Sequence, residues 1–230
     1  MMIIGIDEAG RGPVLGPMVI CGYAIKKDKE EDLKKLGVKD SKELTKNKRA
    51  YLKKLLENFG CSEKLILEAE KINNLMDTIN LNEIEINAFS EVAKNLIKKL
   101  NIKDEEVEIY LDACSTNTKK FESDFKEKIR DVIEERNLKI KIIAEHKADS
   151  KYPVVSAASI IAKAERDEII ENYKKIYGDI GSGYPSDSKT IKFLEDYFKK
   201  HKKLPEITRT KWKTCQRILS KLKQTKLKIE

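Results

Sequence analysis

The chain has 230 residues, of which 40% are hydrophobic and 37% are charged. That is enough apolar material for one sizeable core or two small ones, and it excludes general disorder. No apolar run approaches the ~18 residues that a membrane span requires. The first eight residues contain two acids and no basic region, unlike a secretory signal. We therefore expect a cytoplasmic protein that does not associate with membranes.

The net charge of +8 lies in the C-terminal thirty residues. Residues 201–230 contain ten Lys or Arg and two Glu, whereas residues 1–200 contain 37 basic and 37 acidic side chains. This asymmetry favours an anionic polymer or surface as partner, although a solvated terminal helix would have the same composition. We expect a main domain over 1–200 and a basic helical extension over 201–230. After Trp212, apolar residues recur at helical spacing and predict a helix with one docked face, made by Cys215, Ile218, Leu219 and Leu222.

The N-terminal seventy residues predict three strands and two helices. Apolar runs over 2–7 and 18–25 are typical of a β-hairpin, and the connection between them, 10–17, is rich in Gly and Pro. Thr45 can cap one of the helices that follow. Two polar helices and a third strand are expected over residues 29–36, 45–59 and 65–69.

Beyond residue 80, helices and strands alternate. Residues 154–164 contain only Val, Ala, Ile, two Ser and one Lys, and predict a helix that is buried nearly all round. Such an alternation indicates an α/β fold, a mixed five-stranded sheet flanked by helices, in which helical crossovers make the later strands parallel. The helices are expected over 82–100 and 119–136, and the strands over 106–112 and 139–145.

Four acids fall at or just beyond the carboxyl ends of predicted strands. Asp7 and Glu8 end the first strand, Asp112 ends the fourth, and Asp149 lies just past the fifth. In α/β sheets this edge forms the ligand crevice. Close carboxylates repel one another, and hard cations with oxygen ligands, Mg²⁺ or Mn²⁺, would relieve the repulsion. Each acid alone could be a turn or helix-cap residue, but together they predict a metal site.

The connection over 10–17 offers a second functional feature. Its glycines can expose backbone N–H groups beside Arg11, a cradle for phosphate or sugar oxygens, although a tight hairpin needs the same glycine geometry. It lacks the terminal Gly-Lys-Ser/Thr of a nucleotide-binding P-loop. With two distant histidines and four cysteines that form no Cys-x-x-Cys pair, the sequence disfavours chemistry based on His or Cys.

Five segments together resemble the signature of ribonuclease HII, the type 2 ribonuclease H family, and most closely its archaeal members. They occur in order between residues 5 and 187, and the basic tail falls outside the pattern. Several long motifs in order are far more specific than any single one. The segments are GIDEAGRGP at 5–13, DSK at 40–42, LDA at 111–113, KADSKYP with SAASIIAK at 147–163, and GSGYPSD at 181–187.

The resemblance implies an endonuclease that cuts the RNA strand of RNA–DNA hybrids and cuts at single ribonucleotides embedded in duplex DNA. It implies the ribonuclease H sheet with a helical C-terminal extension. The family's four metal-binding catalytic acids match Asp7, Glu8, Asp112 and Asp149. The positions that would read the ribonucleotide and its 2′-OH match Gly10, Arg11 and Gly12. A substrate-contacting lysine matches Lys42, and the tyrosine of the RNA-to-DNA junction matches Tyr184.

This resemblance agrees with the chemistry of the acids. Cleavage by the RNA's own 2′-OH usually relies on acid–base side chains such as His or Lys, whereas a carboxylate cluster predicts metal-activated water. Two ions ~3.5–4 Å apart would activate the water and stabilise the leaving oxygen. The products would carry a 5′-phosphate and a 3′-hydroxyl, and the 2′-OH would be free for recognition.

Two other classes explain part of the sequence. A non-catalytic hybrid-binding or RNA-binding module accounts for the basic tail and the glycine loop, but not for acids at three strand ends, because acids oppose phosphate binding unless a metal intervenes. Another metal-dependent nuclease, of the integrase or Holliday-junction type, shares the acids but lacks the Gly-Arg-Gly and Gly-Tyr-Pro loops. We expect a monomer. No residue demands an accessory subunit, and none singles out a replication-clamp partner.

Overall fold

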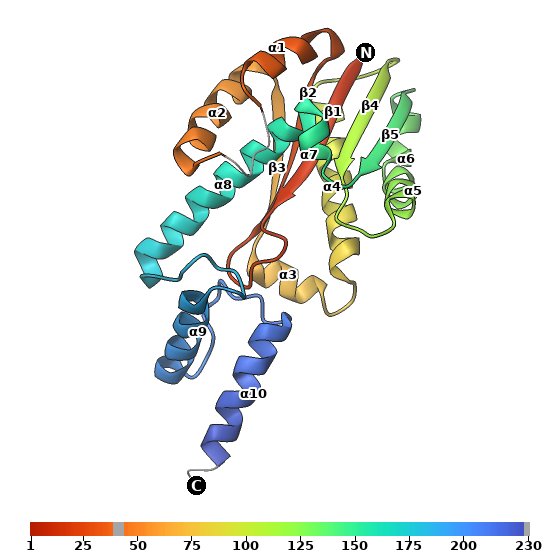
Figure 1. Cartoon of the computed structure of the whole chain (residues 1–230). Helices are drawn as coiled ribbons and strands as arrows, with labels where there is room; N and C mark the ends of the chain where they lie inside the picture. Colours follow the sequence, from red (N-terminus) through yellow and green to blue (C-terminus); the bar gives the residue numbers. More distant parts are fainter. Residues whose placement is uncertain (39–43, 228–230) are drawn as a thin grey trace. The chain divides into compact units, whose positions relative to one another are not determined.

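The computed structural model describes residues 1–38 and 44–227, and side chains up to residue 220 (Figure 1). Its residues group into two compact units, each built from several separate segments. Unit 1 comprises Met1–Ala9, Val19–Ile66 and Leu81–Asp167. Unit 2 comprises Gly10–Met18, Leu67–Asn80 and Glu168–Glu230. The predicted division into 1–200 and 201–230 stays a prediction.

The sheet has the strand order β3-β2-β1-β4-β5. The hairpin is confirmed, because β1 (Met2–Ala9) pairs antiparallel with β2 (Met18–Lys26). On its other side β1 pairs parallel with β4 (Glu106–Asp112), which pairs parallel with β5 (Lys139–Glu145). The predicted mixed five-stranded sheet with parallel later strands is thus confirmed.

The third strand was predicted too late in the chain. β3 covers Cys61–Leu67, and Ala69 begins α3 (Ala69–Leu75), a helix that the sequence pattern did not predict. β3 is one of the two edge strands of the sheet and is largely half-exposed. Because its first half is polar, the apolar pattern indicated only its end.

The helices of unit 1 follow the predicted order with two differences, of which one is the short helix α7 (Ala148–Lys151), which the sequence pattern did not predict. The helix expected over 119–136 is two helices, because the chain leaves helical geometry at Ile129. Thr45 caps α2 as predicted, with its hydroxyl accepting from the Lys48 N–H. The helices are α1 (Glu30–Lys35), α2 (Lys46–Phe59), α4 (Leu81–Lys99), α5 (Thr118–Lys128), α6 (Arg130–Glu135), α7 (Ala148–Lys151) and the first part of α8 (Pro153–Tyr177).

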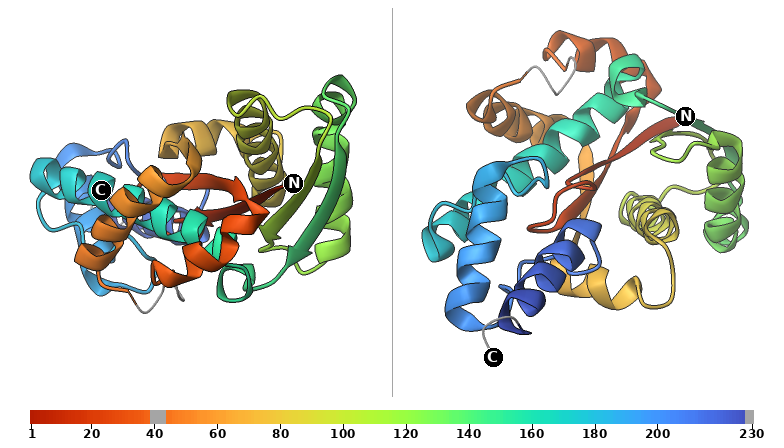
Figure 2. Two further views of the ribbon diagram at one scale, coloured as in Figure 1. Left: turned by 90° about the horizontal axis from the view of Figure 1, so that it is seen from above. Right: turned by 60° about the horizontal axis from the view of Figure 1, so that its bottom comes forward.

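Two glycines show which helix covers which face of the sheet. A Cβ at Gly5 would lie 2.4 Å from the backbone of α8 at Val154 and Val155. A Cβ at Gly22, which pairs with Ile6, would lie 2.6 Å from Val92 and Leu96 of α4. Side chains alternate along a strand, so residues of β1 in register with Gly5 face α8 and the others face α4. Figures 1 and 2 show these two helices on opposite sides of β1.

The buried helix predicted over 154–164 is confirmed as the first part of α8, whose Val, Ala and Ile side chains are in the core. Where the helix turns charged, ion pairs attach it to α2 and β3. The Glu165 carboxylate binds the ammonium groups of Lys53 and Lys64, both at 2.9 Å. Arg49 donates from Nη2 to Asp167 Oδ2 at 2.6 Å. This helix is therefore a fixed support for any side chain that it presents to the sheet.

Unit 2 has its own apolar core, to which the C-terminal segment contributes. Within α10 (Lys213–Leu227), Cys215 and Ile218 are buried, while Lys213 and Arg217 are exposed. The predicted docked face is confirmed for Cys215 and Ile218, Leu219 is half-buried, and the Leu222 side chain lies outside the described part. None of the helices described is both long and apolar enough to cross a bilayer. The core residues are Val14, Leu15, Ile170, Ile180, Leu194, Ile207, Cys215 and Ile218, and α9 (Ser188–His201) supplies Leu194.

Candidate active site

Asp7 and Asp112 come from neighbouring parallel strands in the same register. Ile6 lies beside Leu111 in the β1–β4 ladder, so the next residues along the two strands emerge side by side. Asp7 lies two residues beyond Gly5 and therefore faces α8. The two carboxylates meet on that face of the sheet, as the strand-end argument predicts.

Asp149 reaches the same place through a short turn after β5. Lys147 has a left-handed backbone (φ 56°), after which α7 begins at Ala148. The Ala148 N–H donates to Asp112 Oδ1 at 3.3 Å and so links this turn to the end of β4. One carboxylate oxygen from each of Asp7, Asp112 and Asp149 lies within 4.8 Å of the other two.

The three carboxylates strongly influence one another. Burial and the nearby Asp112 carboxylate raise the pKa of Asp7 to about 7, although a Ser159 hydrogen bond and the Lys163 ammonium oppose the rise. Lys163 Nζ lies 3.8 Å from Asp149 Oδ2. This ammonium acts on Asp7 and Asp149, and a divalent cation would balance the remaining negative charge of the three acids. The oxygen-only donor set suits Mg²⁺ or Mn²⁺.

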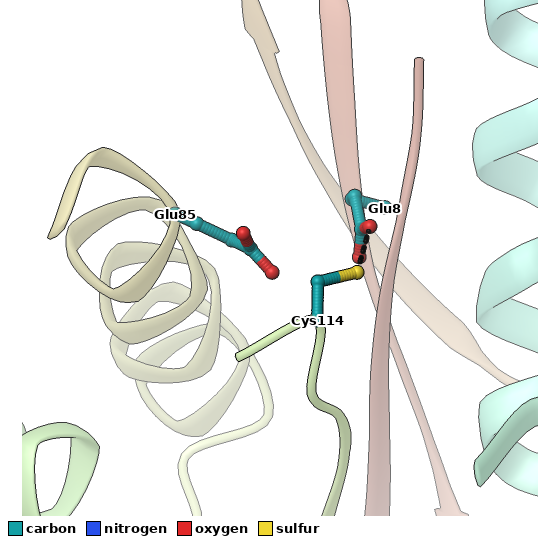
Figure 3. A group of neighbouring side chains, drawn as sticks. All are labelled: Glu8, Glu85 and Cys114. Atoms are coloured by element: carbon teal, nitrogen blue, oxygen red, sulfur yellow. Dashed lines mark hydrogen bonds between the residues drawn. The ribbon is translucent and has the colours of Figure 1, made fainter. Parts of the chain in front are cut away.

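Glu8 lies in a different group of side chains, shown in Figure 3. Because it follows Asp7 on the strand, it points to the opposite face, toward Glu85 of α4 and toward Cys114. The Cys114 thiol donates to Glu8 Oε1 at 2.8 Å, and Glu8 Oε2 is buried without a hydrogen-bond partner among the described residues. Burial, Asp7 and Glu85 raise the pKa of Glu8 well above its usual value. The four predicted acids thus adjoin, but only three share one set of ligand atoms.

Sequence reasoning missed Glu85 and Cys114. Glu85 is buried, and its position carried a signal, because it precedes Phe89 and Val92 by four and seven residues and so belongs to the apolar stripe of its helix. An acid on such a stripe indicates a buried polar contact. Cys114 carried no comparable signal. It adjoins Glu8 only because the chain leaving β4 passes β1.

The predicted substrate-binding residues other than Lys42 lie in unit 2, in two loops that contact each other. Gly10 has a left-handed backbone (φ 82°), which favours glycine. The Val14 N–H donates to the Gly183 carbonyl at 2.8 Å, and a Cβ at Gly12 would lie 3.7 Å from the Tyr184 ring. The Tyr184 side chain is exposed. Lys42 lies outside the described residues.

A known protein of closely similar sequence matches this chain over its whole length. The chain is 82% identical over 230 residues to ribonuclease HII of Methanocaldococcus jannaschii, and the alignment covers all of both chains. The sequence model of the ribonuclease HII family matches residues 4–215.

Two solved structures share the fold. The ribonuclease H2 of Pyrococcus horikoshii superposes with a TM-score of 0.83 at 36% identity, covering 97% of this chain and 99% of that one. The ribonuclease HII of Archaeoglobus fulgidus, solved in a complex with PCNA, gives a TM-score of 0.77 at 36% identity, covering 93% and 96%. The acids at the strand ends, the sheet and the full-length sequence match lead to one conclusion: the chain belongs to the ribonuclease HII family and is an endoribonuclease.

Proposed function

We propose that Asp7, Glu8, Asp112 and Asp149 form the catalytic centre and hold two divalent cations, Mg²⁺ or Mn²⁺. The observation that carries this proposal is the convergence of three aspartate oxygens within 4.8 Å. The buried Glu8 oxygen that lacks a hydrogen-bond partner among the described residues is a further available ligand. Bound there, the cations would activate the attacking water and stabilise the leaving oxygen.

The chain's own residues orient the carboxylates. A hydrogen bond from Ser159 holds Asp7, and Lys163 attracts Asp149 from the same helix. The Ala148 N–H holds Asp112. Each aspartate therefore has a partner that limits its rotation, and such preorganisation lowers the cost of assembling a charged centre.

The proposed substrates are RNA–DNA hybrids and duplex DNA with an embedded ribonucleotide, cut to leave 5′-phosphate and 3′-hydroxyl ends. We assign recognition of the ribose to Gly10, Arg11 and Gly12, and contact with the adjoining nucleotide to Tyr184. The exposed Tyr184 ring beside Gly12 supports this assignment, because a ring on the surface is available to a ligand. We also assign a substrate contact to Lys42, on the sequence match alone.

The proposed partner besides nucleic acid is a sliding clamp, since the Archaeoglobus fulgidus relative was solved in a complex with PCNA. Gel filtration of the chain with and without PCNA tests this partner and the predicted monomeric state together. We also propose a cytoplasmic location, because the proposed substrates are hybrids and duplexes of the cell's own DNA.

The proposed function is tested with three labelled duplexes in Mg²⁺: all-DNA, an RNA–DNA hybrid, and DNA with one ribonucleotide. We expect cleavage of the last two only, with 5′-phosphate and 3′-hydroxyl ends, and none with EDTA. A binding module would cut none of them, and a nuclease of the integrase or junction type would cut without requiring a ribonucleotide.

A further inference from the structure

Arg209 is a fully buried arginine whose guanidinium group donates to backbone carbonyls of the recognition loop, the connection over 10–17 that carries the Gly-Arg-Gly motif. Its Nε donates to the Gly16 carbonyl at 2.9 Å, Nη1 to the Arg11 carbonyl at 3.0 Å, and Nη2 to the Gly10 carbonyl at 2.6 Å. Its backbone N–H also donates to the Val14 carbonyl at 2.8 Å. One residue of the C-terminal segment thus binds four carbonyls of a loop near the N-terminus, and all of them belong to unit 2.

Trp212 extends this contact by one more carbonyl. Its indole Nε1 donates to the Gly12 carbonyl at 3.1 Å. The Arg209 guanidinium carbon lies 5.0 Å from the centre of the Trp212 ring, within the range of a cation–π contact. The two side chains therefore bind the carbonyls of all three residues of the Gly-Arg-Gly motif, Gly10, Arg11 and Gly12.

These hydrogen bonds also set the direction of the loop's N–H groups. In a trans peptide the carbonyl of one residue and the N–H of the next point in opposite directions. Because the carbonyls of Gly10 and Arg11 point at Arg209, the N–H groups of Arg11 and Gly12 point away from it. The residues after Gly12 and Gly16 are prolines, which have no N–H. The loop is therefore held with two adjacent donors directed away from its anchor.

We propose that Arg209 and Trp212 are positioning residues for ribonucleotide recognition. By binding the carbonyl side of the Gly-Arg-Gly motif, they orient its N–H groups toward the oxygens of the ribose and its phosphate. This inference rests on the proposed function, which assigns recognition to this loop. It makes the segment from Arg209 to Trp212 part of the specificity machinery.

The guanidinium group suits this task and an ammonium group does not. Arg209 uses three nitrogens in a rigid planar fork to bind carbonyls that lie in three directions. A lysine would carry the same charge on a single nitrogen and would leave at least one buried carbonyl without a donor. Arg209→Lys therefore removes the geometry while it keeps the charge.

The first test uses Trp212 as a reporter, because it is the only tryptophan in the chain. The full-length protein in EDTA is titrated with duplex DNA that contains one ribonucleotide, and with the matched all-DNA duplex. We expect a saturable change in tryptophan fluorescence with the ribonucleotide duplex that is at least twice the change with all-DNA. Equal changes with the two duplexes would contradict the coupling between Trp212 and ribose recognition.

The second test measures kcat/KM on the single-ribonucleotide duplex together with the thermal midpoint. We expect a ~10²-fold loss for Arg209→Lys, as for a misplaced recognition group. Trp212→Phe keeps a ring and removes only the N–H, so we expect a smaller loss of ~10-fold, expressed mainly in KM. Trp212→Phe keeps the proposal testable if Arg209→Lys fails to fold.

The matched control is Asn73→Ala. Asn73 Nδ2 donates to the Thr208 carbonyl at 2.9 Å, so this variant loosens the same segment beside Arg209 without touching the loop. We expect it to lower the midpoint while kcat/KM stays within ~2-fold of wild type. If Trp212→Phe loses no more activity than Asn73→Ala, the positioning role is wrong.

Arg11→Pro separates this inference from the proposed function, because proline has no N–H and so removes one of the two donors itself. If folded Arg11→Pro loses ribonucleotide cleavage while Trp212→Phe behaves like Asn73→Ala, only the inference fails. If Arg11→Pro cleaves at the wild-type rate, the loop does not read the substrate through this donor, and the proposed recognition and the inference fail together.

Discussion

Asp7 is the residue on which the proposed chemistry depends most. It is buried, lies on the central strand β1, and adjoins both Asp112 and Asp149. Asp7→Asn removes the charge and leaves the volume nearly unchanged, so we expect a ~10³-fold or greater loss of turnover with an intact fold. Circular dichroism and cleavage of the single-ribonucleotide duplex check this. Near wild-type cleavage by a variant with confirmed loss of metal binding would contradict the assignment.

The effect of Asp7→Asn on thermal stability should depend on pH. In metal-free protein the pKa of Asp7 is raised from 3.8 to about 7, so the folded state binds this proton more tightly than the unfolded state. The resulting stability is present below about pH 4 and is lost as the pH rises through 7. In EDTA, Asp7→Asn should therefore melt higher than wild type at pH 8, and this advantage should shrink toward pH 4. A constant difference across this range would contradict the raised pKa.

Tyr184 is the other residue for which function and packing predict different results. The residue is 44% exposed, so truncation removes less buried surface than it would at a core position. Tyr184→Ala should reduce cleavage of a single embedded ribonucleotide by ~10-fold or more, as expected for loss of a stacking contact, and lower the thermal midpoint by less than ~2 °C. Tyr184→Phe serves as the control that keeps the ring. Losses that track unfolding on every substrate would favour a packing role.

Among the elements, β1 and α8 approach each other so closely at Gly5 that a side chain there has no room. A methyl group at Gly5 would lie 2.4 Å from backbone atoms of Val154 and Val155, which cannot move aside as a side chain can. Because α8 also carries Ser159 and Lys163, this contact fixes their distance from the aspartates. We expect Gly5→Ala to lower the free energy of unfolding by ~3 kcal/mol or more, measured by denaturant titration.

The control for this prediction is Gly37→Ala. Its added methyl would meet no atom within 4 Å, so only the left-handed backbone (φ 82°) is tested, at a cost of about 1 kcal/mol. If the two variants were equally stable, the close approach of β1 and α8 would be wrong.

The elements that sequence reasoning identified are those with a strong apolar period. β1, α4 and the first part of α8 are buried, and their patterns predicted them closely. The edge strand β3 and the short helix α3 have mixed burial and weak periods, so their bounds depend on tertiary contacts that no local pattern encodes. The break at Ile129 between α5 and α6 has the same cause, since no Pro or Gly marks it.

In the candidate site, too, some contacts could be predicted from the sequence and others depend on tertiary structure. The sequence predicted that three aspartates converge, because parallel strands bring their carboxyl ends to one edge of the sheet. These are Asp7, Asp112 and Asp149. That Glu8 turns toward Glu85 and Cys114 depends on the alternation of β1 and on which helix covers each face. The contact of Arg209 with the recognition loop joins residues almost 200 positions apart and could not be predicted from spacing.

At the scale of the whole molecule, the charge of the C-terminal segment predicts how the protein binds duplexes. Lys213 is exposed, and the side chains of Lys221 and Lys223, which the sequence pattern predicts to face away from the docked face, lie outside the described part. Each lost phosphate contact lowers the slope of log affinity against log salt by ~0.9, so replacing these three lysines with Gln should lower it by up to ~2.7. Turnover at saturating substrate should be unchanged.

The matched control neutralises three exposed lysines elsewhere, Lys119, Lys126 and Lys139. Affinity for the hybrid and for duplex DNA is measured at several salt concentrations. An equal slope for both triple variants would mean that the position of the tail's charge has no role in substrate binding.

In the proposed mechanism the carboxylate centre directs water, rather than the ribose 2′-OH, at the phosphodiester bond. A single-turnover cleavage of the one-ribonucleotide duplex in ¹⁸O-enriched water, with Mg²⁺, tests it by mass spectrometry of the products. Attack by metal-activated water would leave one ¹⁸O atom in the new 5′-phosphate and an unlabelled 3′-hydroxyl on the other product. A 2′,3′-cyclic phosphate without ¹⁸O would contradict it, since that product forms by attack of the 2′-OH.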